Sequence, residues 1–106
     1  MIDAQEARGL ARQALGSLDR AGRDGWHRQY VLALAGAIAA ARNDVERADE
    51  MLVEAATNLH ELRATLPHQA RPRVRQAFDW LIDHLEKQGD PQRAEEFRAL
   101  RDETLQ

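Results

Sequence analysis

The sequence predicts an all-α protein built from four or five antiparallel helices. Apolar residues recur at spacings of three and four along most of the chain, which is the period of an amphipathic helix. Alanine, leucine, arginine and glutamate dominate and β-branched residues are scarce, which favours helix throughout. No segment alternates between apolar and polar residues in the way that is typical of a strand.

The composition is that of one soluble globular domain spanning residues 1–106. Hydrophobic residues make up 43% and charged residues 31%, which excludes a disordered chain. Because there is no cysteine, disulfides and thiolate chemistry are excluded, and we expect a cytoplasmic protein. The N-terminus lacks the apolar core of a signal peptide. The longest apolar run, 31–41, is too short to cross a bilayer, so we expect no membrane contact.

The first predicted helix runs from about Asp3 to Arg20. Asp3 and Glu6 have the spacing of a capping box, and Gly22 and Gly25 interrupt the pattern after the helix. The helix has one apolar stripe, formed by Ala7, Leu10, Ala11, Ala14, Leu15 and Leu18.

The second predicted helix covers about Gly25 to Arg42, with Asp24 as its N-cap. Its centre, 31–41, is rich in alanine and contains a glycine. Small side chains let neighbouring backbones approach closely, so we expect this helix to be the central one.

Asn43 and Glu46 form a second cap signal, and the third predicted helix extends from there to about Leu66. Pro67 and Pro72 then force a bend or a short loop. The third helix has a clear apolar stripe, which consists of Val45, Ala48, Leu52, Ala55, Ala56, Leu59 and Leu62.

The fourth predicted helix opens near Pro72, and a tight corner joins it to the fifth. Gly89 suits a left-handed helix exit, Asp90 is an N-cap, and Pro91 fits the first helical position. The residues predicted to point inward are Val74, Phe78, Leu81, Ile82 and Leu85 on the fourth helix, and Ala94, Phe97 and Leu100 on the fifth.

The predicted helical pairs share a spacing pattern with a known repeat family. Its positions are occupied by Leu32, Ala35, Gly36, Ala39, Ala48, Leu52 and Ala55, and more weakly by Phe78, Leu81, Ile82, Leu85, Gly89 and Ala94. In this the chain resembles tetratricopeptide repeats, which implies a stack of helical hairpins that binds other proteins. The matching alanines Ala7, Ala48 and Ala94 are 41 and 46 residues apart, whereas the family repeats every ~34. A plain helical bundle is the alternative.

We predict no catalytic, cofactor or metal site. Histidines 27, 60, 68 and 84 form no pair at the spacing of two ligands on one helical face. Ser17 is the only serine, and there is no glycine-rich phosphate loop. An enzyme or metal protein would have to assemble its site from distant helices.

Trp80 is predicted to bind a partner. It lies about 200° around the helix from Phe78, opposite the inward stripe. The same outer face has polar residues, namely Gln76, Asp83, His84 and Lys87. A tryptophan beside polar residues such as His84 is a common anchor for a partner or a second copy. The alternative is that another helix covers Trp80.

Trp26 and Tyr30, one turn apart, form a second candidate. They are suited to the floor of a groove for a peptide or a helix. The alternative is that the pair closes the end of the core.

Arg71, Arg73 and Arg75 form a third candidate, with Arg63 and His68 nearby in the sequence. The arginine fork suits carboxylates and phosphates. The alternative is a solvated loop that pairs with the acidic third helix.

The function that these features favour is a non-enzymatic interaction or adaptor module that binds another protein or a second copy of itself. The alternative is a small helical subunit that contacts nucleic acid through Arg63, Arg71, Arg73 and Arg75. The net charge of −3 argues against general nucleic-acid binding.

Overall fold

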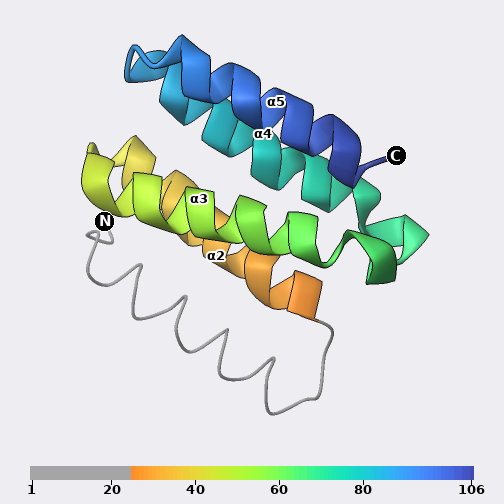
Figure 1. The fold of residues 1–106 in the computed structure, drawn as a ribbon. Helices are drawn as coiled ribbons and strands as arrows, with labels where there is room; N and C mark the ends of the chain where they lie inside the picture. Colours follow the sequence, from red (N-terminus) through yellow and green to blue (C-terminus); the bar gives the residue numbers. More distant parts are fainter. Residues whose placement is uncertain (1–24) are drawn as a thin grey trace.

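The computed structural model describes residues 25–106, which form four α-helices and two single-turn 3₁₀ helices (Figure 1). The elements are α2 (Gly25–Ala41), α3 (Val45–Glu61), η1 (Arg63–Thr65), η2 (His68–Ala70), α4 (Arg71–Lys87) and α5 (Pro91–Thr104). This described part contains no strand, so the predicted all-α class is confirmed for it. The first predicted helix and the Asp24 cap lie outside the described residues.

The helices form two antiparallel hairpins, α2 with α3 and α4 with α5, stacked on each other (Figure 1). As a result α2 and α4 lie next to each other and run in the same direction. Among the described helices, α3 and α4 each contact the other three, whereas α2 packs mainly on α3 and α4. The expectation that the second helix is the central one is therefore not met within this part of the chain.

Small side chains on α2 allow α3 to approach closely. A Cβ atom added at Gly36 would lie 2.7 Å from Cγ of Leu52, which is closer than real Cβ atoms pack, and 3.1 Å from Cβ of Met51, which is a tight contact. Ala33 and Ala39, on the same side of α2, are also buried. The distance between the two helices is thus set by the absence of a side chain at Gly36.

The core lies between the two hairpins and is filled mainly from α3 and α4. The largest fully buried side chains all come from these helices, and they are Leu52, Leu59, Val74, Phe78, Leu81 and Leu85. Burying a side chain of this size contributes roughly 1.5–3 kcal/mol. The inward stripes predicted for the third and fourth helices supply all six.

The corner between α2 and α3 differs from the prediction. Asn43 has φ of 63° and ends α2 in the left-handed conformation, instead of capping α3. Asparagine tolerates this conformation better than most residues, which suits it to the end of a helix as well as to an N-cap. Asp44 occupies the N-cap position of α3 and forms an ion pair with Arg47 at 3.1 Å.

The third helix ends at Glu61, earlier than the predicted Leu66. The chain continues through η1 and reaches Leu66 in an extended conformation. Extended backbone is what a following proline imposes, so Pro67 explains why helix does not continue up to it.

The corner between α4 and α5 confirms the prediction. Gly89 has φ of 76°, and the side chain of Asp90 accepts a hydrogen bond from the backbone nitrogen of Arg93 at 3.2 Å. Pro91 is the first residue of α5. An N-cap of this kind contributes about 1 kcal/mol.

We predict that Gly36→Val lowers the free energy of unfolding by about 2–3 kcal/mol, because the new side chain overlaps with Leu52. Ala41→Val is the control, since it adds a valine to the exposed end of the same helix, and its effect should be about 0.5 kcal/mol or less. Urea denaturation measures both values. Equal effects would contradict the close contact between α2 and α3.

Candidate functional site

Tyr30 of α2 and Trp80 of α4 meet where the two helices lie side by side. Their ring centroids are 5.7 Å apart, and the guanidinium carbon of Arg73 lies 5.2 Å from the centroid of the Tyr30 ring. The Tyr30 hydroxyl donates a hydrogen bond to Oε1 of Gln76 at 2.8 Å. Aromatic pairs and cation–π contacts each contribute about 0.5–1.5 kcal/mol. The structure thus brings together three residues that the sequence assigned to three separate candidate sites.

Two apolar side chains extend this group along α2. Leu34 is 41% exposed and Ile38 is 37% exposed. They follow Tyr30 at intervals of four residues, so all three lie on neighbouring positions of one helix surface. This exposed pair was hidden in the sequence within the apolar run 31–41. The sequence did contain a signal for this pair, because Leu34 and Ile38 are larger than the alanines and the glycine next to them.

A pocket of about 370 Å³ continues the surface between the end of α2 and α4. Ala37 and Ala41 line its α2 side, and Trp80, Asp83 and Lys87 line its α4 side. We call the whole surface the α2–α4 face and define it by Tyr30, Leu34, Ala37, Ile38, Ala41, Arg73, Gln76, Trp80, Asp83 and Lys87.

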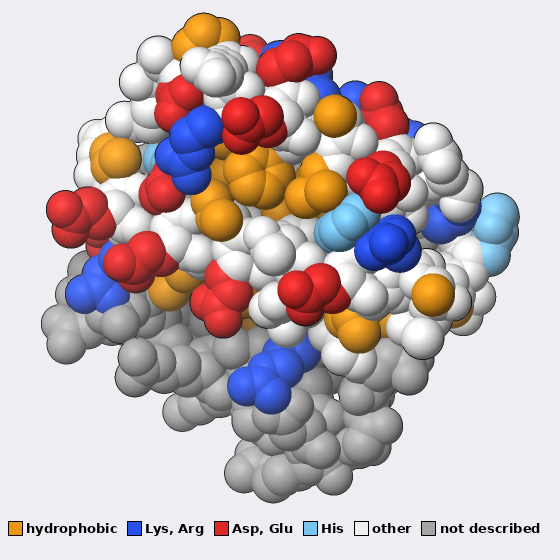
Figure 2. Space-filling model, in the orientation of Figure 1, with side chains coloured by type: hydrophobic (Ala, Val, Ile, Leu, Met, Phe, Trp, Pro, Cys, Tyr) orange, Lys and Arg blue, Asp and Glu red, His pale blue; other side chains and the backbone are white. Residues whose placement is uncertain are grey.

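The charges on the described helices are divided unevenly. The segment that forms α2 contains no acidic residue, and on α4 Asp83 forms an ion pair with Lys87 at 2.9 Å. By contrast, α3 carries five acidic residues and one arginine. Figure 2 shows the side where α3 and α5 lie, with acidic side chains spread across it.

Trp26 does not belong to the α2–α4 face. Its side chain is buried, with 6% exposed, and its ring lies 3.7 Å from that of His27. Trp26 therefore closes the end of the core, as the alternative interpretation of this pair proposed, whereas Tyr30 remains at the surface.

His84 is also buried, so its predicted place on the outer polar face is wrong. Both α2 and α3 pack against α4, and the buried arc of α4 is therefore wider than the inward stripe indicated. Nε2 of His84 lies 3.8 Å from Oδ1 of Asp49 on α3. Other atoms of the residue line the pocket beside Trp80.

Asp49 connects three helices. Both of its carboxylate oxygens accept hydrogen bonds from Arg93 of α5, at 3.2 and 3.3 Å, and it faces His84 of α4. The hydrogen bond from Arg93 to Asp49 raises the pKa of the guanidinium group, despite the opposing effect of burial. The sequence contained no local signal for the contacts among Asp49, His84 and Arg93, since Asp49 is far from the other two residues in the chain.

The arginine cluster is divided between different surroundings. Arg73 lies over Tyr30, while Arg71 donates a hydrogen bond to the backbone carbonyl of Leu105. Arg75 is exposed and lines, with Arg71 and His68, a pocket of about 500 Å³ near the start of α4. Residues two positions apart on a helix point about 200° apart, which separates Arg73 from both neighbours.

Arg63, the fourth member of the predicted arginine surface, donates a hydrogen bond to the backbone carbonyl of His60 at 2.9 Å. It therefore binds the C-terminal end of α3 and is not part of the α2–α4 face.

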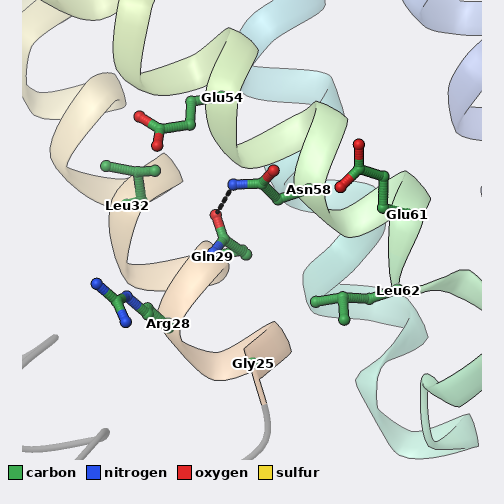
Figure 3. A pocket seen from close by; sticks show the side chains of 8 residues that line it. All are labelled: Gly25, Arg28, Gln29, Leu32, Glu54, Asn58, Glu61 and Leu62. Atoms are coloured by element: carbon green, nitrogen blue, oxygen red, sulfur yellow. Dashed lines mark hydrogen bonds between the residues drawn. The ribbon is translucent and has the colours of Figure 1, made fainter.

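A further pocket, of about 600 Å³, lies between α2 and α3 (Figure 3). Asn58 of α3 donates a hydrogen bond to Oε1 of Gln29 of α2 across it, at 3.1 Å. Glu54 and Glu61 line the α3 side, and Leu32 lines the α2 side. The pocket thus has a polar contact that joins the two helices and no nucleophile with an adjacent base.

Within residues 25–106, no group of three or more histidine or acidic side chains is placed to hold a metal ion. In the same part of the chain, no helix has the length and apolar character needed to span a membrane. The described residues define an all-helical bundle of hairpins with an aromatic and aliphatic surface. Comparison of the chain with protein-family models, curated proteins and solved structures finds no match.

We predict that the two tryptophans differ in their access to solvent. In a Trp26→Phe variant, iodide should quench the fluorescence of the remaining Trp80, which is half-buried. In a Trp80→Phe variant, the buried Trp26 should be quenched several-fold less and should emit at shorter wavelength. Equal quenching in the two variants would contradict the placement of Trp80 at the surface.

We predict that Asp49→Asn lowers the free energy of unfolding by about 1 kcal/mol, because it removes the paired hydrogen bonds of Arg93. Asp83→Asn serves as a control for the loss of one charge in an exposed pair, and its effect should stay within about 0.5 kcal/mol. Thermal unfolding of both variants is the measurement. Similar shifts of the melting temperature would contradict a stabilising contact between Asp49 and Arg93.

Proposed function

We propose that this protein is a non-enzymatic interaction module that binds a segment of another protein on its α2–α4 face. The observation that carries the proposal is the exposure of Leu34 and Ile38 next to the half-buried pair Tyr30 and Trp80. Covering apolar surface of this kind with a partner removes it from water and stabilises the complex. Trp80 and Tyr30 are the residue types that most often dominate the binding energy of an interface.

The shape of the face favours an elongated partner segment. Tyr30 and Ile38 are eight residues apart, which corresponds to about 12 Å along the helix axis. Two neighbouring helices that run in the same direction form the surface (Figure 1). Residues 25–106 offer no strand edge to which a strand could be added, so we expect the partner to bind as an amphipathic helix or another segment that lays apolar side chains along α2 and α4.

The stacked antiparallel hairpins are also what the resemblance to tetratricopeptide repeats implies, and we retain that relationship as part of the proposal. In this arrangement α2 and α4 are the first helices of two successive hairpins. We place the protein in the cytoplasm because its sequence contains no cysteine.

Nucleic-acid binding remains the alternative function. It has support from Arg71, Arg75 and His68, which line one pocket. The support is weaker than for the α2–α4 face, because Arg73 faces α2 and Arg71 binds the carbonyl of Leu105.

We predict that a photoreactive benzoylphenylalanine at position 34 forms a crosslink to another protein in cells that naturally express this chain. The same group at position 75 is the matched control, because Arg75 is exposed but lies outside the α2–α4 face. Adding Ile38→Asp should reduce the crosslink at position 34 by about tenfold or more, since it places a charge in the apolar surface. Circular dichroism verifies that the variant stays folded.

Two results would count against the proposal. One is the absence of a protein adduct at position 34, and the other is an adduct that Ile38→Asp leaves unchanged in the folded variant. A nucleic-acid adduct at position 75 would favour the alternative function.

A further inference from the structure

We infer that the segment bound by the α2–α4 face is acidic as well as apolar, with a carboxylate that pairs with Arg73 beside the apolar side chains that cover Leu34 and Ile38. This inference rests on the proposed function and names the chemistry of its partner. It follows from the position of Arg73, from the distribution of charge, and from what a second copy of the chain could offer.

Arg73 is held at the edge of the apolar surface without a partner of opposite charge. Its guanidinium group lies over the Tyr30 ring, and its side chain is exposed. Within residues 25–106 no carboxylate forms an ion pair with it, whereas Arg93, Arg98 and Arg101 each pair with acidic side chains. The fork of an arginine held in this way is suited to a carboxylate supplied by a partner.

The rest of the face does not balance this charge. Asp83 is the only acidic residue of the α2–α4 face, and Lys87 pairs with it at 2.9 Å. No acidic residue lies on α2. The positive charge of Arg73 is therefore not balanced by an acidic residue of the face. A partner with complementary charge would carry an acidic residue at this position.

Residues 25–106 of a second copy do not supply the required combination. The described acidic side chains lie mainly on α3 and α5, where Val53, Phe97 and Leu100 are only partly exposed and pack against the core. The one exposed large apolar side chain there is Val45. Pairing of two α2–α4 faces would offer Arg73 no carboxylate except Asp83, which already pairs with Lys87. We therefore commit to a different protein as the occupant.

The test begins with a phage-displayed library of random peptides of about sixteen residues, the length of a helix that matches α2. The library is selected against the full chain, and selected peptides are synthesised and measured by stopped-flow fluorescence at several salt concentrations. The expected sequences combine apolar residues at helical spacing with aspartate or glutamate. Ile38→Asp identifies the peptides that bind the α2–α4 face.

For those peptides, Arg73→Glu should lower the association rate constant about tenfold and reduce its dependence on salt, because a charge at the rim of an interface acts mainly on association. Arg73→Lys loses the fork but retains the charge that governs association, so its association rate constant should stay within about threefold of that of the original protein. Arg75→Glu introduces the same change of charge on another side of α4, and it should leave the rate nearly unchanged.

Three results would overturn the inference. The first is a set of peptides whose binding depends on Ile38, which lack acidic residues and bind Arg73→Glu equally well. This result would refute the acidic partner and leave the proposed function standing. Self-association of the chain that Ile38→Asp abolishes would make a second copy the occupant. If no selected peptide depends on Ile38, both the inference and the proposed function fail.

Discussion

The contact of Gly36 with Leu52 is the constraint on which the arrangement of the described helices depends. Because residue 36 has no side chain, α3 lies close enough for Leu52 to fill the space beside α2. The alanines at 33 and 39 continue this small surface. Leu34 and Ile38 lie on the opposite side of α2 from Gly36 and consequently point away from α3. A helix that is apolar on several sides normally has protein around it on those sides, and the described helices cover α2 only in part.

Polar contacts around the core hold the second hairpin in place against the first. Asp49 binds Arg93 and lies next to His84, so one carboxylate relates α3 to both helices of the second hairpin. Within the second hairpin, Arg101 of α5 binds Asp79 of α4 at 3.0 Å. A fixed α4 keeps Trp80 and Arg73 in position beside Tyr30. The surface that we propose for binding is thus preformed, which reduces the entropy lost when a partner associates.

Local rules explain which features the sequence could predict. Helical periodicity identified the inward stripes, and the glycine, aspartate and proline at 89–91 specified a corner that depends only on neighbouring residues. The same local rules placed Asn43 incorrectly, because asparagine suits both the end of one helix and the start of the next. Helical geometry also placed Trp80 on the opposite side of α4 from Phe78. In the structure Trp80 is half-buried, beside Tyr30 of α2.

Features that depend on several helices could not be predicted in this way. The burial of His84 and Trp26 follows from the number of neighbours around each helix, which no single helix specifies. The meeting of Tyr30, Arg73 and Trp80 requires the alignment of α2 with α4, a tertiary relationship. The separation of Arg73 from Arg71 and Arg75 is different, because the angle between residues on a helix already implies it.

The most direct measurement uses the isoleucine methyl groups. The chain has three isoleucines, and two of them, Ile38 and Ile82, lie in the described part. Ile38 is 37% exposed and Ile82 is 6% exposed. In a methyl-labelled sample of the free protein, a soluble paramagnetic agent should broaden the Ile38 signal strongly and leave the Ile82 signal sharp. Equal protection of the two signals would contradict an α2 whose large apolar side chains face solvent.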